Sequence, residues 1–146
     1  MEYEEMQTTA TAIIMRDKGF MADDWDGTFW TADEDLNGDH LALDLGPEAD
    51  LPALTGHLDR IALIRIRFAS FADGRGFTLA RRLRAMGYRG RLRAAGHVLA
   101  DQYAMARRAG FDEVEIAPAM AARQPEDQWL ARADWRAGDY QARLKG

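Results

Sequence analysis

The spacing of apolar residues between positions 61 and 117 switches repeatedly between a period of two and a period of three to four, which predicts strands alternating with helices. The predicted segments are strands at 61–68, 89–95 and 111–117 and helices within 73–88 and 96–110. Strands that alternate with helices of this length form βαβ crossovers. We therefore expect an α/β fold with a parallel βαβαβ core over residues 60–117.

The two predicted helices each have an apolar stripe and a polar face. The stripe of the first contains Phe77, Leu79, Ala80 and Leu83, and that of the second contains Leu99, Tyr103 and Ala106. In the first helix we expect Arg81, Arg82 and Arg84 to face solvent. Gly87 and Gly110 are placed to end the two helices.

Charged residues occupy the second face of the predicted strands. Arg65 and Arg67 lie opposite the apolar residues of 61–68, and two arginines do not suit a completely buried face. We expect this face either to lie near a sheet edge or to pair its arginines with acids of the N-terminal third. The other two strands continue the pattern with Arg91, Arg93, Glu113 and Glu115.

The first 59 residues predict a smaller, β-rich cap. Its predicted elements are a strand at Thr8–Met15, a hairpin return at Phe20-Met21, a strand at His40–Leu45 and a helix within Glu48–Leu58. Phe29 and Trp30 are expected to cover a sheet edge. Trp25 and Trp30 either pack against the rest of the domain or form an interface, because aromatic residues are enriched at binding hot spots.

The last 29 residues predict a helical tail that begins at Glu126, with Trp129, Leu130 and Ala133 on its apolar side. Gly138 is expected to end this helix, and Tyr140 and Leu144 to follow as an extended segment or turn. The 146 residues suit one domain, with a cap at 1–59, a core at 60–117 and a tail at 118–146.

The composition narrows the range of functions. The chain has no cysteine, which removes disulfides, thiolate nucleophiles and cysteine-bound metal clusters. It has no run of about 18 apolar residues, so we expect no membrane span. Its N-terminus is acidic, so we expect no secretory signal. We expect a cytoplasmic protein. The three histidines are too scattered to suggest a zinc site, so neither a metal nor a cofactor is expected.

The net charge of −5 is unevenly distributed. Residues 1–59 carry 15 acidic and 2 basic side chains, whereas residues 60–108 carry 12 arginines and two acids. The arginines either solvate helix faces, dock onto the acidic N-terminal third, or meet an anionic partner. Nucleic acid is not favoured, because the whole chain is acidic and no nucleic-acid-binding motif accompanies the arginines.

The best candidate for a ligand site is the loop Asp73-Gly74-Arg75-Gly76. In an open α/β sheet, ligands bind beyond the carboxyl ends of the parallel strands, and this loop follows such an end. It leads into a helix N-terminus, which favours anions, and Arg75 can clamp a phosphate, sulfate or carboxylate with two hydrogen bonds. Alternatively, Asp73 caps the turn and pairs with Arg75. The loop matches neither a P-loop nor a dinucleotide-binding fingerprint.

Three further polar residues follow the next strand. His97, Asp101 and Gln102 are expected at the same edge of the sheet as Asp73 and Arg75, where the loops after 68, 95 and 117 meet. His97 is either an acid or base or a cap for its own helix. Gln102 lies beside the apolar stripe, and we expect it to hydrogen-bond a neighbouring loop.

The central segment FADGRGFTLARRLRAMGYRGRLRAAGHVLADQ, followed by RRAGFD, resembles a bacterial family of unknown function. The resemblance is close across Leu58–Asp112 and looser elsewhere, including ADDW at Ala22–Trp25. Members of this family are typically encoded beside assimilatory sulfite reductase and phosphoadenylyl-sulfate reductase genes. They are often described as oxidoreductases of sulfite reduction. Arg67, Ser70, His97 and Ala109 stand where the family usually has an acid, a lysine, an aspartate and a cysteine.

The resemblance implies an accessory protein of assimilatory sulfate or sulfite reduction. Such a protein would dock to a sulfite or phosphoadenylyl-sulfate reductase, or would bind a small anion at the strand-end loops. The alternative is an enzyme that acts on a small anionic substrate at the same edge. Exposed sheet edges and the two early tryptophans are also compatible with a homo-oligomer.

Overall fold

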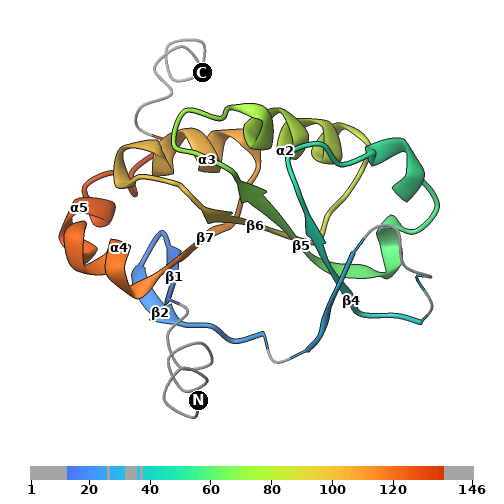
Figure 1. Ribbon diagram of the computed structural model, residues 1–146, viewed down its shortest axis with the longest axis horizontal. Coiled ribbons are helices and arrows are strands. Elements are labelled where there is room, and N and C mark those ends of the chain that lie inside the picture. The colour runs from blue at the N-terminus through green and yellow to red at the C-terminus, as the bar shows by residue number, and fades with distance from the viewer. Residues whose placement is uncertain (1–12, 26, 32–35, 37, 137–146) are drawn as a thin grey trace.

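The computed structural model of the chain describes residues 13–25, 27–31, 36 and 38–136. Within them, seven strands form one mixed sheet in the order β2-β1-β7-β6-β5-β4-β3 (Figure 1). The strands are β1 Ile13–Arg16, β2 Gly19–Ala22, β3 Phe29–Trp30, β4 Leu41–Leu45, β5 Ile61–Phe68, β6 Arg91–Gly96 and β7 Glu113–Ile116. Strands β3 to β7 are parallel, while β1 is antiparallel to both β7 and β2. The expected α/β fold with a parallel core is confirmed.

Two helices cover one face of this sheet, and two shorter ones lie beside its β2 end (Figure 1). The helices are α2 Arg75–Ala85, α3 Tyr103–Ala109, α4 Pro118–Arg123 and α5 Glu126–Leu130. Short 3₁₀ turns span Leu51–Leu54, Leu58–Arg60 and Ala100–Gln102. Helix α2 ends before Gly87 and α3 before Gly110, and both glycines have positive φ, as expected for helix C-termini.

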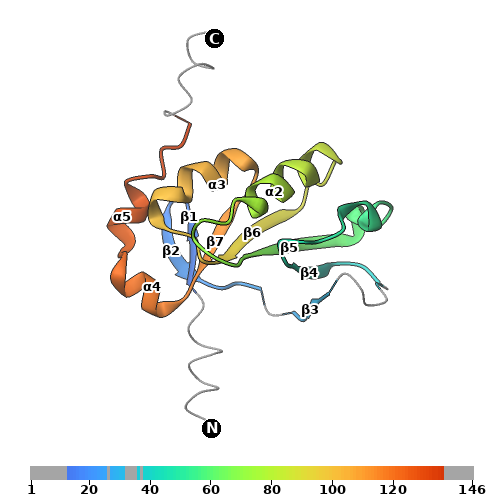
Figure 2. The same ribbon diagram turned by 45° about the horizontal axis from the view of Figure 1, so that its top comes forward.

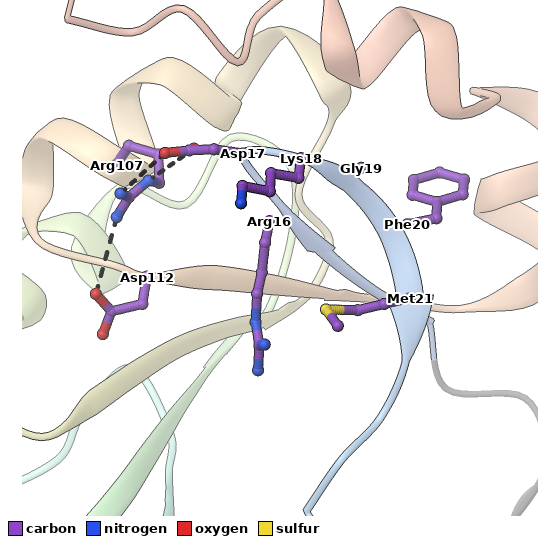
Figure 3. Close-up of a pocket in the computed structure, with 8 residues that line it drawn as sticks. All are labelled: Arg16, Asp17, Lys18, Gly19, Phe20, Met21, Arg107 and Asp112. Carbon is purple, nitrogen blue, oxygen red and sulfur yellow. Dashed lines mark hydrogen bonds and ion pairs between the residues drawn. The ribbon is translucent and has the colours of Figure 1, made fainter.

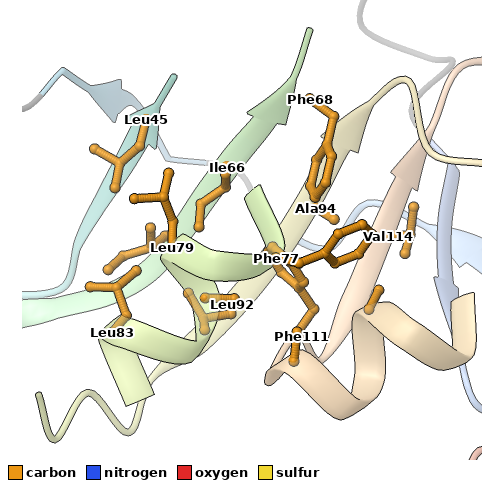
Figure 4. Close-up of a cluster of buried hydrophobic side chains, with 14 of the residues drawn as sticks. Leu45, Ile66, Phe68, Phe77, Leu79, Leu83, Leu92, Ala94, Phe111 and Val114 are labelled. Atoms are coloured by element: carbon orange, nitrogen blue, oxygen red, sulfur yellow. The ribbon is translucent and has the colours of Figure 1, made fainter. Parts of the chain in front are cut away.

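The apolar stripes of the helices pack on alternate residues of the parallel strands (Figure 4). Phe77 and Leu83 of α2 are buried, as are Leu92 and Ala94 of β6. Phe68 closes one end of this core, with its ring 4.9 Å from that of Phe77. We call this the helix-covered face of the sheet.

The N-terminal strands join both edges of the same sheet. β1 and β2 lie beyond β7, whereas β3 and β4 lie beyond β5. The described residues between β2 and β3, 23–25 and 27–28, therefore lie on the side of the sheet opposite α2 and α3 (Figure 1, Figure 2). This position brings the acidic residues that follow β2 over the charged face of the central strands.

The prediction of a helix within Glu48–Leu58 is wrong. Leu51 and Leu54 are buried as their spacing predicted, but they lie in a 3₁₀ turn. Pro52 occupies its first turn, and Gly56 then adopts a φ of +93°. That conformation is left-handed and turns the chain before Leu58, so the helix does not continue.

Four other expectations need correction. Arg84 does not face solvent: it is half-buried and donates hydrogen bonds to the carbonyls of Tyr88, Gly90 and Gly110. Trp129 is buried but its neighbour Leu130 is 40% exposed, because α5 turns that side chain away from the sheet. Helix α4 was not predicted, since Pro118 resembles a break rather than a helix start. The helix that begins at Glu126 ends at Leu130, so the prediction that it continues to Gly138 is wrong. The predictions for Thr8–Ala12, Tyr140 and Leu144 fall outside the described residues.

Candidate functional site

The loops after β5 and β6 lie side by side at the carboxyl edge of the sheet. The Gln102 side-chain amide donates a hydrogen bond to the Phe71 carbonyl at 3.0 Å. The His97 ring stands perpendicular to the Phe71 ring, with their centroids 4.9 Å apart. Two of the predicted site residues, His97 and Gln102, are thus brought together around one loop residue, and Gln102 bonds the neighbouring loop as expected.

Asp73 and Arg75 form a tight pair within their own loop. The Asp73 carboxylate accepts hydrogen bonds from the Arg75 backbone N–H at 3.1 Å and from its guanidinium Nε and Nη2, both at 2.9 Å. These bonds from Arg75 lower the pKa of Asp73 and raise that of Arg75. The alternative interpretation of this loop is therefore the one that the structure shows, and an anion at Arg75 would have to compete with Asp73.

The glycines of the loop have different surroundings. A side chain at Gly76 would lie within 2.4 Å of the Phe68 ring, so this glycine lets the start of α2 rest on the core. Gly74 precedes α2 as its N-cap, and no atom lies within 4 Å of the position of an added Cβ. Gly76 is thus explained by packing, whereas the space beside Gly74 is open.

Asp101, the remaining predicted site residue, lies in a loop after β6 that ion pairs and side-chain hydrogen bonds stabilise. Asp101 pairs with Arg132 at 3.0 Å, and both side chains are exposed. The side-chain Oε1 of Gln102 accepts a hydrogen bond from Leu99 N–H at 2.8 Å, and the side-chain Oε1 of Gln124 accepts one from Ala100 N–H at 2.7 Å. No hydrogen bond or ion pair in the described part of the chain joins this group to Asp73 or Arg75.

The face of the sheet opposite α2 and α3 carries a charge network that sequence reasoning anticipated only in part. Five arginines and five acids pair with one another on it, and we call it the ionic face. Its members are Arg16, Arg65, Arg67, Arg91, Arg93, Asp23, Asp24, Asp44, Glu113 and Glu115. The numbers of positive and negative side chains are equal, so the face is close to neutral.

Arg93 lies at the centre of the ionic face and is completely buried. It donates to Glu113 at 2.7 Å, to Glu115 at 2.9 Å and to Asp23 at 2.9 Å. Burial by itself would lower the pKa of Arg93, but the hydrogen bonds that Arg93 donates to Asp23 and Glu113 outweigh this effect and raise the pKa. Asp23 belongs to the segment after β2, so this contact fastens that segment to the sheet.

Arg65 shows how the N-terminal third completes the network. Its guanidinium bonds Asp44 of β4 at 3.0 Å and Glu115 of β7 at 3.2 Å. The same group lies 3.9 Å from the centre of the Phe29 ring, in a cation–π contact. Of the two alternatives for the strand arginines, pairing with N-terminal acids is the one observed.

The outer face of α2 contrasts with this neutral network. It is formed by the exposed residues Thr78, Arg81, Arg82 and Ala85. Among the residues that the structure describes, neither the Arg81 nor the Arg82 side chain makes a hydrogen bond or an ion pair. No acidic residue occurs between Asp73 and Asp101, so the helix has no acid of its own to neutralise them. This face carries uncompensated positive charge.

Two pockets lie at the opposite, amino edge of the parallel strands. One of about 410 Å³ lies beneath the β1–β2 turn, beside Arg107 and Asp112 (Figure 3). The other, of about 470 Å³, lies between the start of β5 and the end of α2 and is lined by residues that include Met86 and Arg89. Sequence reasoning missed both, because it placed ligands at the carboxyl edge.

The described residues contain no cluster of three or more His, Cys, Asp or Glu side chains arranged to hold a metal ion. In the same residues, no helix is long and apolar enough to cross a bilayer.

Comparison with known proteins gives a family. No curated protein matches the chain in sequence. The model of a family described as bacterial protein of unknown function (DUF934) matches residues 42–146, which include most of β4, strands β5 to β7, helices α2 to α5 and the predicted strand-end loops. Because the match covers more than half of the chain, the protein belongs to the DUF934 family of bacterial proteins.

Proposed function

We propose that this protein is an accessory factor of assimilatory sulfate or sulfite reduction that docks to a reductase through the outer face of α2. The link to that pathway rests on the resemblance of the central segment to proteins encoded beside reductase genes. The observation that carries the docking mode is the exposure of Arg81 and Arg82 without a partner among the described residues. An acidic surface on a reductase would complement this charge.

Arg81 and Arg82 differ in their surroundings from the arginines of the ionic face and from Arg84. The arginines of the ionic face already form ion pairs with its acids, and they could bind a partner protein only by breaking those pairs. Arg84 of the same helix turns inward and pairs with Asp112 at 2.9 Å. Arg81 and Arg82 are therefore free to form intermolecular pairs without first breaking an internal one in the described structure.

Binding of a small anion at the carboxyl edge is less well supported, because Arg75 is engaged by Asp73. An anion there would have to supply more hydrogen bonds than the carboxylate it displaces. Thermal denaturation with sulfate, sulfite, phosphate and adenylyl-sulfate nucleotides tests this mode. A shift with one anion that Arg75→Ala abolishes would favour anion binding over docking.

The docking proposal is tested with sulfite reductase and phosphoadenylyl-sulfate reductase purified from the same bacterium. We expect one of them to form a complex in sedimentation velocity, weakened by raising NaCl from 50 to 300 mM because exposed charges are screened. The double variant Arg81→Glu/Arg82→Glu should weaken binding by roughly tenfold or more, since rim charges control encounter and pairing.

Arg123 provides a matched control. Like Arg82, it is an exposed arginine in the last turn of a helix. Arg123→Glu should leave the affinity unchanged, whereas Arg82→Glu alone should reduce it. Equal effects of the two substitutions, or no complex with either reductase at tens of micromolar, would contradict the proposal. So would binding of RNA or DNA that depends on Arg81 and Arg82 in the absence of any reductase complex.

A further inference from the structure

The pocket between the start of β5 and the end of α2 adjoins the outer face of α2, through which we propose that the protein docks. Its volume is about 470 Å³, and it is lined by Leu58, Asp59, Ile61, Met86, Gly87, Arg89 and Gly90. Met86 follows Arg82 by one helical turn, and its N–H donates to the Arg82 carbonyl at 2.9 Å. Residues spaced by four are neighbours on a helix surface, so the exposed Arg82 lies beside Met86 and hence beside the pocket.

The turn that closes the pocket at the end of α2 is held by hydrogen bonds on both sides. Gly87 has a φ of +101°, which turns the chain away from the helix. Arg84 donates to the carbonyls of Tyr88 at 3.0 Å and Gly90 at 2.8 Å. The Tyr88 hydroxyl donates to the carbonyl of Ile61, at the start of β5, at 3.1 Å. Because these bonds join the turn to both α2 and β5, the pocket is formed before a ligand arrives, which lowers the ordering cost of binding.

The apolar part of the lining lies on the helix-covered face of the sheet. Ile61 is buried, whereas Leu58 and Met86 are half-buried. Ile61 belongs to the hydrophobic core that contains Leu83 and Leu92, and Leu58 and Met86 pack against the same core. The three side chains therefore share one face, and the two half-buried ones retain apolar surface that a ligand can cover.

Two charged side chains of the lining are free to meet a ligand. Arg89 and Asp59 are exposed, and neither side chain makes a hydrogen bond or an ion pair with the residues that the structure describes. The side chain of Arg82, beside the pocket, is unpaired in the same sense. Two cations and one anion thus border the pocket. Acidic groups of a ligand would be attracted by Arg82 and Arg89 and repelled by Asp59.

We propose that this pocket receives one large apolar side chain from an extended acidic segment of the partner protein, whose neighbouring carboxylates pair with Arg82 and Arg89. The inference rests on the proposed docking through α2 and adds the chemistry of the segment that docks. The volume is in the range of sites that enclose small ligands, so a leucine or phenylalanine side chain fits. An extended chain advances about 3.3 Å per residue, so two residues span the helical turn of about 5.4 Å between Met86 and Arg82.

Other ligands would use only part of this surface. An inorganic anion would pair with an arginine but would leave Leu58 and Met86 uncovered. A neutral apolar molecule would cover those two side chains but would leave the arginines unpaired. Nucleic acid would carry its phosphates past Asp59 and would leave the apolar lining unused. An acidic segment with one apolar anchor satisfies both parts, in the arrangement of a buried anchor within a polar rim that protein interfaces have.

The test uses acetylated and amidated pentapeptides that separate the charge from the anchor. Glu-Glu-Glu-Leu-Gly is made in both orders, because the segment can run in either direction along α2. Gln-Gln-Gln-Leu-Gly removes the charge, and Glu-Glu-Glu-Ala-Gly removes the anchor. Binding to the full chain is followed by ¹H–¹⁵N NMR through the amide signals of Gly87 and Gly90, which line the pocket. We expect an acidic leucine peptide to bind at millimolar concentration, and the other two, made in the same order, to bind about fivefold more weakly.

Variants locate the two parts of the site. Arg89→Gln should weaken the acidic leucine peptide about threefold and leave the glutamine peptide unchanged, because only the first offers it a carboxylate. Met86→Ser should weaken both peptides, whereas Met86→Leu should bind both as the wild type does. Arg123→Gln, which removes an exposed charge on α4, should change neither.

Failure of this inference is distinguishable from failure of the proposed function. If a reductase complex is weakened by Arg81→Glu/Arg82→Glu but not by Met86→Ser, the docking stands and the pocket inference is overturned. If the acidic leucine peptide binds as expected but neither reductase does, the pocket inference is supported and the assignment to the pathway fails. The pocket inference is also overturned if no acidic leucine peptide binds at millimolar concentration, or if the alanine peptide binds as tightly.

Discussion

One face of the sheet packs Leu92, Ala94 and Val114 against α2 and α3, whereas the other face of the same strands holds Arg93, Glu113 and Glu115. On the first face stabilisation comes from apolar area removed from water and does not depend on the identity of each neighbour. On the second, each buried charge requires specific partners, because an unpaired one would be costly. The difference teaches that the helix-covered face supplies stability, while the ionic face specifies which strands and which N-terminal segment come together.

The largest expected effect is the loss of Arg93. Arg93→Met keeps the approximate volume but leaves Glu113 and Glu115 without their central partner, so we expect a loss of about 3–5 kcal/mol in the free energy of unfolding. Urea denaturation measures it. The exposed Arg132→Met, which also breaks an ion pair, should cost less than about 1 kcal/mol. Similar losses for the two variants would mean that the ionic face does not depend on its buried centre.

The helix-covered face should respond differently to solution conditions. Leu83→Ala removes a completely buried side chain of α2 and should cost about 2–5 kcal/mol. This loss should be the same in 0.05 and 0.5 M NaCl, because no charge is involved. The loss caused by Arg67→Met, at the exposed end of the ionic face, should shrink in the higher salt. A salt-dependent Leu83→Ala would contradict the distinction between the faces.

Acid should weaken the ionic face selectively. Burial and the neighbouring Asp24 raise the pKa of Asp23, but hydrogen bonds from Arg93 and from Trp25 N–H bring it below its usual 3.8. At a pH between the folded pKa of Asp23 and 3.8, the unfolded chain binds more protons than the folded chain. The contribution of Asp23 to the free energy of unfolding is therefore complete above about pH 4 and is lost as the pH is lowered. Urea midpoints at pH 3, 3.5, 4, 5 and 7 should show this fall.

Asp23→Asn provides the control for the acid effect. It should be less stable than the wild type at pH 7 and should show a shallower decline below pH 4. Asp17 and Asp24, whose pKa values are also lowered, retain part of the slope. An unchanged slope in Asp23→Asn would show that the segment after β2 is not fastened by this carboxylate.

The smallest effects are expected at the carboxyl edge. Gln102→Ala removes bonds to Phe71 and Leu99 and should cost about 1–2 kcal/mol in thermal or urea denaturation. Asp101→Ala breaks only an exposed pair and should change stability by less than about 0.5 kcal/mol. If Asp101→Ala were the more damaging of the two, the exposed pair would matter more than the hydrogen bonds that join the loops.

The sequence predicted the central strands and α2 well because their apolar period is unbroken. It wrongly predicted a helix within Glu48–Leu58, because the apolar spacing there is helical, whereas the chain forms only a 3₁₀ turn at Leu51–Leu54 and then turns at Gly56. The convergence of Arg93 with Asp23 also lay beyond sequence reasoning, because 70 residues separate them and strand order is not visible in periodicity. The pocket beneath the β1–β2 turn was missed for the same reason: Asp17 and Arg107 meet only in the folded chain.

For the predicted ligand loops, residue type indicated polar contacts but not their partners. Arg75 next to Asp73 is compatible with either a clamp for an anion or an internal pair, and only geometry distinguishes them. His97 and Gln102 were correctly expected at one edge, because parallel strands end together. Whether this edge binds a ligand stays a prediction that the Arg75→Ala experiment addresses.

The pairing of β1 with β7 has a consequence for synthesis on the ribosome. Arg16 and its partner Glu113 are 97 residues apart. At roughly 5–20 residues per second, the first strand emerges about 5–20 seconds before its neighbour exists. Through that interval the nascent N-terminal third carries a large excess of like charge, and self-repulsion keeps it soluble. The arginines that neutralise it arrive with β5 and β6, so the acidic segment loses its repulsion only when the sheet that receives it has been made.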